Sequence, residues 1–212
     1  MRINKTYLKI PCGPDHDKRL FNFHLPYLRK KIGVMVSGGL DSALLYFLIH
    51  KLNEEGGRSH KIQPFLMQRQ EGSKIYGPKI IQYVHEMFGV DLDIVLVGDH
   101  SIDEDRQIWS AINQALQNYD INALFVGSIE TMEIHTIGWR PPVKPIDSEN
   151  FINPFKDLNK SHIVDLVYKL RQEQLFKLSH SCIYQIRCNG CLSCQERAWG
   201  FSELGKIDPG ED

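Results

Sequence analysis

The clearest pattern of hydrophobic and polar positions lies between residues 31 and 57. An apolar run at residues 32–36, which contains several β-branched side chains, predicts a buried strand. Ser-Gly-Gly follows, and from Leu40 apolar side chains recur at helical spacing up to about residue 55, where a Gly-Gly pair suits the end of a helix. The pattern therefore predicts a strand, a glycine turn and a helix in direct succession.

Strand and helix patterns go on alternating as far as residue 126. The further strands are predicted at residues 62–67, 92–97 and 123–126, and the further helices at residues 78–88 and 105–119. Pro78 suits the first turn of its helix. Because such alternation produces a parallel sheet with right-handed crossovers, we expect an α/β fold whose ligand lies beyond the carboxyl ends of the strands.

The parts of the chain outside this alternation have weaker patterns. Residues 1–30 are broken up by prolines, residues 7–10 could form a short edge strand, and Cys12 is expected to be an unreactive thiol. Residues 127–157 have little regular pattern, which is typical of a lid or binding loop and equally of a surface excursion. A last helix is predicted at residues 159–170.

Composition narrows the class of protein. The 212 residues include 42% hydrophobic and 24% charged side chains, as in an ordinary globular chain, and they suffice for one sizeable domain with a small appendage. No apolar run approaches the length of a membrane span, and residues 1–5 lack the apolar core of a secretory signal, so we expect a cytoplasmic protein. The net charge of −1 argues against a broad nucleic-acid surface.

The glycine turn, Ser37-Gly38-Gly39-Leu40-Asp41-Ser42, leads from a strand into a helix. Backbone N–H groups at a helix start point at one spot, where the positive end of the helix dipole favours phosphate or pyrophosphate. Glycine allows the anion to approach closely and accepts positive φ. The turn is neither G-x-x-x-x-G-K-[ST] nor G-x-G-x-x-G, so those two phosphate loops are excluded. The alternative is a glycine-rich turn without a ligand.

Four of the five cysteines crowd into the tail, with the spacing C-x5-C-x2-C-x2-C from Cys182 to Cys194. Clustering without an export signal favours a metal over disulfides, and four thiolates suit a closed, tetrahedral, structural zinc site. The alternatives are an iron–sulfur cluster, four free thiols, or a three-cysteine metal site with Cys182 as a catalytic thiol. Nearby, His180 could support the metal ligands or contact a substrate, or it could be an ordinary surface histidine.

Residues 37–42 resemble the S-G-G-x-D-S signature of the PP-loop ATP pyrophosphatases, which split ATP between its α- and β-phosphates and adenylate a substrate. Together with the tail, the turn resembles the 7-cyano-7-deazaguanine synthase (QueC-type) family of these enzymes. Residues 153–160, Asn-Pro-Phe-Lys-Asp-Leu-Asn-Lys, are similar to the family's Pro–aliphatic…Leu-x-Lys stretch before a helix. Residues 181–197, followed by Asp208-Pro209, are similar to its S/T-C-Y…C-G-x-C-x-x-C-x-x-R tail.

The resemblance implies a Rossmann-like (adenine nucleotide alpha hydrolase-like) parallel sheet flanked by helices, with a small C-terminal zinc-binding segment. It also implies an ATP-dependent ligase that adenylates a carboxylate and releases pyrophosphate. In the family's reaction, 7-carboxy-7-deazaguanine and ammonia become the nitrile 7-cyano-7-deazaguanine (preQ0) of queuosine biosynthesis. ATP, Mg²⁺ and Zn²⁺ are the implied cofactors.

Each implied role falls on residues that match the family pattern. Ser37, Asp41 and Lys160 are the implied catalytic residues. Asp41 would orient the turn or contact Mg²⁺, and Lys160 would stabilise the leaving pyrophosphate unless it is simply a solvated lysine in a first helical turn. The implied nucleotide-binding residues are Val36, Ser37, Gly38, Gly39, Leu40, Asp41, Ser42, Met67 and Gly127. The implied metal ligands are Cys182, Cys188, Cys191 and Cys194.

The middle of the chain departs from the family. After the second strand the family typically has Tyr-Gly-Gln-Arg/Lys-His, where this chain has Gln68-Arg69-Gln70-Glu71-Gly72, and its Gly-Tyr-Pro-Asp after the fourth strand is missing. These segments line the nucleobase side, so the acceptor stays open between a deazaguanine-type carboxylate and another carboxylate, such as a protein terminus or another pathway intermediate. A tRNA-modifying PP-loop enzyme and a non-catalytic nucleotide-binding partner are further alternatives.

We expect three parts along the chain: an N-terminal extension at residues 1–30, a PP-loop nucleotide-binding α/β domain at 31–178, and a four-cysteine zinc-binding segment at 179–212. The expected partners are a small carboxylate substrate and ammonia, without a membrane and without nucleic acid. The sequence leaves open a protein partner, a homodimer and the source of the ammonia.

Overall fold

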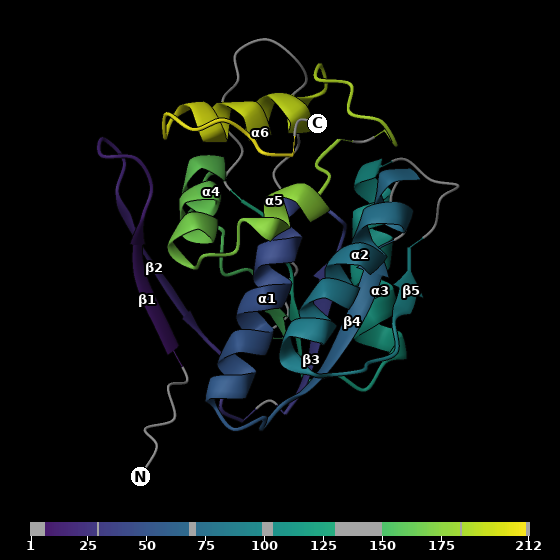
Figure 1. Ribbon diagram of the computed structural model, residues 1–212. Coiled ribbons are helices and arrows are strands. Elements are labelled where there is room, and N and C mark those ends of the chain that lie inside the picture. Colours follow the sequence, from purple (N-terminus) through teal and green to yellow (C-terminus); the bar gives the residue numbers. More distant parts are fainter. Residues whose placement is uncertain are drawn as a thin grey trace.

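The structure is a computed structural model, and it describes residues 7–28, 30–67, 71–98, 104–129, 150–182 and 184–210. Its centre is a five-stranded sheet, in which each described pair of neighbouring strands is parallel. In spatial order the strands are β5 (Val95–Val97), β4 (Lys61–Met67), β3 (Lys31–Val36), β6 (Ala123–Phe125) and β7 (Phe151–Ile152). The expected Rossmann-like α/β class is thereby confirmed (Figure 1).

Helices cover both faces of this sheet. The helices are α1 (Leu40–Glu55), α2 (Glu71–Phe88), α3 (Glu104–Asn118), α4 (Lys160–Lys169), α5 (Gln174–Leu178) and α6 (Leu192–Ser202). Alternate side chains of β3 point to opposite faces: Ile32 and Val34 join a core with α1 and α2, whereas Met35 joins a second core with α3. Both faces are therefore buried, as is usual for a parallel sheet.

A separate antiparallel hairpin, β1 (Tyr7–Cys12) with β2 (Arg19–His24), adds to the first core. Phe21 and Phe23 are buried, and the ring of Phe21 lies 5.5 Å from that of Phe155. Cys12 is fully buried, and burial raises the pKa of its thiol to about 11. The thiol is therefore protonated at neutral pH, as expected for an unreactive cysteine.

The C-terminal helices gather at one end of the sheet. Figure 1 shows α4, α5 and α6 near the N-terminal end of α1. Because α1 directly follows the glycine turn after β3, this is the end of the sheet where the parallel strands finish. The chain thus places its tail beside the glycine turn. Among the described residues, no helix combines the length and the apolar character needed to cross a membrane.

Some sequence predictions were wrong in detail. The strand predicted at residues 92–97 begins only at Val95, and α2 begins at Glu71, so Pro78 lies inside the helix and not in its first turn. Strand β7 interrupts the stretch that had been expected to be irregular, because its two residues pair with β6. The predicted lid or binding loop falls mostly on residues 130–149, outside the described residues.

His50 on α1 is an unusual core residue. It is 3% exposed and packs on Tyr46 and Phe88, with ring centroids 4.6 and 5.7 Å away. Its Nε2 has no hydrogen-bond partner among the described residues. Burial, with a smaller contribution from His85, lowers the pKa of His50 to about 3, so the folded protein keeps this ring neutral.

We expect this histidine to make stability depend on pH. Between pH 6.5 and 3 the unfolded chain binds a proton at His50 that the folded chain does not, so the free energy of unfolding falls as the pH falls. Through this histidine alone, the free energy of unfolding should be about 2 kcal/mol lower at pH 5 than at pH 7.5. Urea unfolding at both pH values measures it. His50→Phe should remove this part of the pH dependence, whereas His24→Phe, at an exposed position, should keep it. An unchanged pH dependence in His50→Phe contradicts the assignment.

Candidate functional site

The glycine turn, residues 37–42, connects the end of β3 to the start of α1. Gly38 has φ +85°, a conformation that side chains other than glycine rarely adopt, and Gly39 is the N-cap residue without a side-chain cap. The first backbone hydrogen bond of the helix runs from Ala43 N to Gly39 O, at 3.0 Å. The N–H groups of the first helical turn are therefore available for an anion.

Two serines hold the turn in shape. The Oγ atom of Ser42 donates to Gly39 O at 3.0 Å and accepts from the backbone N–H of Ser37 at 3.1 Å. The Oγ atom of Ser37 lies 3.1 Å from that of Ser42. Ser42 is buried, so it acts on the backbone of the turn, whereas the half-buried Ser37 can also reach a ligand.

The turn lies at the switch point of the sheet. The chain runs from β3 through α1 to β4 on one side, while β6 pairs with β3 on the other side, and ligands of open α/β sheets bind at such a reversal. Gly127 follows β6 and lies against the backbone of the glycine turn. A Cβ atom on Gly127 would lie 3.1 Å from Asp41 O, so the absence of a side chain lets these two segments approach closely. Two predicted binding residues are thus brought together.

The remaining predicted binding residues offer only their backbone to the site. Val36 and Leu40 are fully buried, as the last residue of β3 and the first of α1. Met67 ends β4, but its side chain packs in the core beneath α3. These three residues therefore position the turn and its neighbouring strand from within the core.

Lys160, the first residue of α4, reaches the turn from 119 residues away. Its ammonium group donates to both carboxylate oxygens of Asp41, each at 2.6 Å. The lysine side chain is 2% exposed and that of Asp41 is 20% exposed. The structure thus brings two of the predicted catalytic residues together as a buried ion pair with one open side.

A second carboxylate, that of Glu196, lies close to this lysine. Glu196 Oε2 is 3.5 Å from Lys160 Nζ, and the glutamate side chain is 7% exposed. Glu196 belongs to α6, and a Cβ atom on Gly200 of the same helix would lie 2.6 Å from Lys160 Cγ. The missing side chain of Gly200 therefore lets α6 pack directly on the lysine.

His180 joins the glycine turn to the cysteine loop. Its backbone N–H donates to Gly38 O at 2.8 Å, and its Nε2 lies 2.7 Å from Tyr184 O. The ring stacks on Tyr76 of α2, with centroids 4.3 Å apart and planes 7° from parallel. Burial lowers the pKa of His180, although the bond to Tyr184 opposes this shift, so the ring is neutral at pH 7 and Nε2–H donates to the carbonyl. The alternative of an ordinary surface histidine is wrong, because His180 is 8% exposed. The geometry makes His180 a bridge between the two segments, a role that the sequence did not predict.

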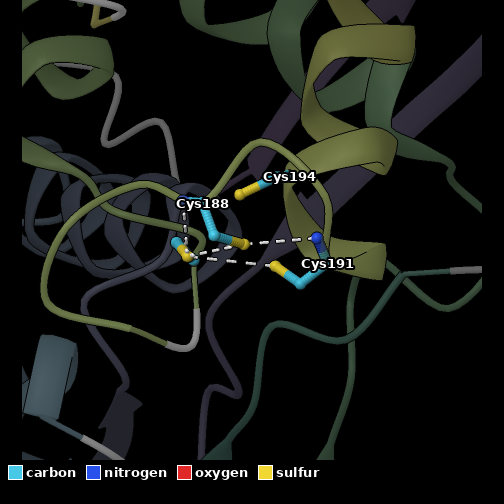
Figure 2. Close-up of side chains that lie close together, drawn as sticks. Cys188, Cys191 and Cys194 are labelled. Atoms are coloured by element: carbon cyan, nitrogen blue, oxygen red, sulfur yellow. Dashed lines mark hydrogen bonds between the residues drawn. The ribbon is translucent and has the colours of Figure 1, made fainter.

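The four predicted metal ligands, Cys182, Cys188, Cys191 and Cys194, lie together, with all sulfur atoms within 4.8 Å of one another. Figure 2 shows Cys188, Cys191 and Cys194 around one point. The sulfur of Cys182 is 3.6 Å from that of Cys188 and 3.9 Å from that of Cys191. Backbone N–H groups of Gly190 and Cys191 lower the pKa of Cys188 to about 6, which favours the thiolate that binds metal.

This donor set fits a single metal ion. Four thiolates at the zinc–sulfur distance in tetrahedral geometry are about 3.8 Å apart, close to the 3.6 and 3.9 Å that separate Cys182 from Cys188 and Cys191. A [4Fe–4S] cluster places each thiolate on a different iron, and a [2Fe–2S] cluster places two thiolates on each of its two irons, so both clusters require wider separations than a single ion between thiolates on different irons. Because Cys182 is as close to the centre as the others, the geometry also argues against its role as a separate catalytic thiol.

A buried ion pair closes the cysteine segment, residues 179–210. Arg197 is 1% exposed and donates from Nε and Nη2 to both carboxylate oxygens of Asp208, at 2.6 and 2.8 Å. It also donates to Phe176 O within α5 and to Ser179 O, the C-cap residue of that helix. Although burial opposes it, the hydrogen bonds and charge of Arg197 hold the pKa of Asp208 below its ordinary value. The shape of this segment thus depends on a fully satisfied charge pair.

Two residues of the site were missed by the sequence reasoning. Glu196 lies two residues beyond Cys194, one of the predicted metal ligands. A signal was therefore present, because a bound metal would also fix the residues next to its ligand. No comparable signal marks Tyr76, whose stacking on His180 depends on how α2 packs.

Comparisons with known proteins add little to this geometry. No protein-family model matches the sequence, and no curated protein matches it. Among solved structures, the chain is similar to the U34-tRNA thiolase NcsA from Methanococcus maripaludis with its [4Fe-4S] cluster. The TM-score is 0.49 and the identity 14%, over 85% of this chain and 67% of that one. At this level the neighbour carries no information on the activity or the metal of this chain.

We expect Asp208→Asn to destabilise the protein by about 3–5 kcal/mol, because it leaves Arg197 buried with a neutral partner. The matched control is Asp120→Asn, since Asp120 pairs with Lys31 at the surface and is 80% exposed. This control should cost less than about 1 kcal/mol. Urea unfolding of both variants measures the difference, and equal effects would show that the buried pair contributes no more than the exposed one.

We also expect one zinc ion per chain in freshly purified protein. Cys182→Ala should lose the metal and lower the melting temperature, because three thiolates bind zinc far more weakly than four. Cys12→Ala is the matched control: this cysteine is equally buried but lies outside the cluster, so the metal should remain. Elemental analysis of each variant measures the content. Metal-free wild-type protein, or iron with labile sulfide, would overturn the zinc assignment.

Proposed function

We propose that this chain is an ATP pyrophosphatase of the PP-loop kind, which adenylates a carboxylate and releases pyrophosphate. The observation that carries the proposal is the position of the Ser-Gly-Gly-x-Asp-Ser turn at the switch point of the sheet, with its N–H groups open and Asp41 partly exposed. A nucleotide bound there would place its phosphates at the positive end of α1.

The first step needs stabilisation of a growing negative charge. A carboxylate oxygen of the substrate attacks the α-phosphorus of ATP, the bond to the bridging oxygen breaks, and pyrophosphate leaves. The N–H groups of the turn and the Ser37 hydroxyl would hold that pyrophosphate. Mg²⁺ would neutralise phosphate charge, and Asp41 is the carboxylate of the turn that could contact it.

The later steps follow the chemistry of the resembled family. Ammonia attacks the acyl carbon and displaces AMP, which gives an amide and releases a proton. A second ATP activates the amide oxygen in the same way, and loss of AMP and protons leaves the nitrile. We propose 7-carboxy-7-deazaguanine as the acceptor, with another carboxylate as the alternative, because the residues after β4 and β6 differ from the family pattern.

The zinc in this proposal is structural. All four clustered thiols would be used as ligands, which leaves no position for substrate on the metal. The spare cysteine, Cys12, is buried as a protonated thiol. A sulfur-transfer reaction that needs a reactive cysteine outside the metal site is therefore disfavoured.

The test is incubation with ATP, Mg²⁺, ammonium and 7-carboxy-7-deazaguanine, followed by measurement of pyrophosphate and of the mass of the base. A nitrile product with pyrophosphate is expected. Asp41→Asn should lower the rate at least about a hundredfold, because a charge that acts in the transition state is lost. Asp15→Asn is the matched control, since this carboxylate is 96% exposed and bonds only to Lys18 among the described residues, and its rate should match the wild type.

The other outcomes separate the alternatives. Pyrophosphate release on a different carboxylate supports the same activation chemistry with another acceptor. Release only with tRNA would identify a tRNA-modifying enzyme, and ATP binding without turnover would identify a nucleotide-binding partner. A protein that binds no ATP would overturn the proposal altogether.

A further inference from the structure

One face of α4 is attached to the backbone of the N-terminal hairpin, β1 with β2. Because a carbonyl oxygen only accepts, His162 Nε2 donates to Asp17 O, at 2.9 Å. Asp165 Oδ2 accepts from the backbone N–H of Gly13 at 2.8 Å, and Lys169 Nζ donates to a backbone carbonyl of β1 at 2.6 Å. These three side chains are three and four residues apart along the helix, so they share one face.

Lys160 extends from the opposite face of the same helix. At 3.6 residues per turn, it points about 160° away from His162. Its ammonium group donates to Asp41 at 2.6 Å, and Gly200 of α6 lies against its stem. Helix α4 therefore connects the hairpin on one face to the glycine turn on the other, and a movement of its first turn would displace the lysine from Asp41.

The contact between His162 and the hairpin is closely fitted. The histidine side chain is fully buried, which is costly unless its ring nitrogens have partners. Besides the bond to Asp17 O, Nδ1 accepts from the backbone N–H of Asn159 at 3.3 Å, in the capping box that starts α4. Gly13 has φ +101°, and a Cβ atom there would lie 2.5 Å from His162 Cδ2. The absence of that side chain lets the hairpin backbone meet the ring directly.

We propose that His162 is a positioning residue for the adenylation: it fixes the first turn of α4 on the hairpin, so that Lys160 is held at Asp41 of the glycine turn. The inference rests on the proposed function, because it gives the lysine a part in the reaction at that turn. A charged group stabilises a transition state only from a fixed position, and a displacement of about 1 Å can lower a rate about a hundredfold. Through His162 the N-terminal hairpin contributes to the geometry of the site, although it precedes the α/β domain.

The test replaces His162 with each of two amides and measures pyrophosphate release from ATP with Mg²⁺, ammonium and 7-carboxy-7-deazaguanine. His162→Gln keeps a donor for Asp17 O, and glutamine suits this position of a capping box. His162→Asn keeps an acceptor near the position of Nδ1 but is too short to reach Asp17 O. We expect kcat to fall about tenfold in His162→Asn, with the KM for ATP unchanged because the N–H groups of the glycine turn remain. His162→Gln should restore kcat to near the wild-type value.

Hydrogen exchange of the protein alone tests the same coupling without a reaction. In His162→Asn, exchange should become about tenfold faster at residues 159–165 and also at residues 37–44, because Lys160 connects the two segments. A merely structural role would confine the change to the hairpin and α4. Wild-type protein that releases no pyrophosphate would overturn the proposed function, while the exchange data would still decide whether His162 positions the glycine turn.

His60→Asn is the matched control. His60 Nε2 also donates to a backbone carbonyl, Pro26 O at 3.2 Å, but His60 directly precedes β4, at the end of the sheet opposite to the glycine turn. This variant should keep the wild-type kcat and the wild-type exchange at residues 37–44. An unchanged kcat in His162→Asn, an equal loss in both His162 variants, or faster exchange confined to the hairpin and α4 would each overturn the proposal.

Gly13→Ala provides a second measurement if His162→Asn fails to fold. The added methyl group would meet His162 Cδ2 and Asp17 O, so it separates the hairpin from α4 and leaves the capping box in place. We expect kcat to fall about tenfold, again with an unchanged KM for ATP. A wild-type kcat in this variant would contradict the positioning role.

Discussion

The contact on which the site depends is the buried ammonium of Lys160, held by Asp41 of the glycine turn and approached by Glu196 of α6. A glycine turn has few side chains with which to fix its own conformation. Here the serines shape it from within, and Lys160 anchors it from a segment more than a hundred residues later. A buried ion pair contributes little net stability, but separating its partners leaves an uncompensated buried charge, which is strongly unfavourable. The position of the turn is therefore set by how the C-terminal helices pack.

The C-terminal helices themselves pack through buried apolar side chains such as Val164, Phe176 and Phe201, whereas the loop before α6 depends on polar and sulfur groups. The loop before α6 exposes Tyr184 and Ile186, by 57% and 83%, so it contributes little to either core. The four sulfur atoms and the Arg197–Asp208 pair are what bring the two ends of this segment together. His180 connects this segment to the glycine turn, because its backbone N–H donates a hydrogen bond to Gly38 O. Metal ligands, ion pair and turn form one connected structure.

The sequence was informative wherever the decisive forces are local. Residues 31–55 contain a strand pattern, a glycine turn and a helix pattern in succession, and the structure has β3, the turn and α1 at those positions. The cysteine spacing likewise requires ligands that lie close along the chain. Tertiary packing decided the rest: α2 accommodates Pro78 in its interior because its neighbours hold the helix, and the two residues of β7 are ordered by β6. No local pattern could place Lys160 against Asp41.

The distribution of cysteines limits the chemistry that the site can perform. All five are described: four point at one another, and Cys12 is a buried, protonated thiol. Among the described residues, the groups at the turn that could act on a substrate are oxygen and nitrogen groups, namely backbone N–H groups, the Ser37 hydroxyl and the Asp41 carboxylate beside Lys160. Such groups suit the stabilisation of phosphate charge, and none is a strong nucleophile. Because every cysteine of the chain is either in the cluster or buried as a protonated thiol, the structure disfavours a reaction in which the protein transfers sulfur from a cysteine outside the cluster.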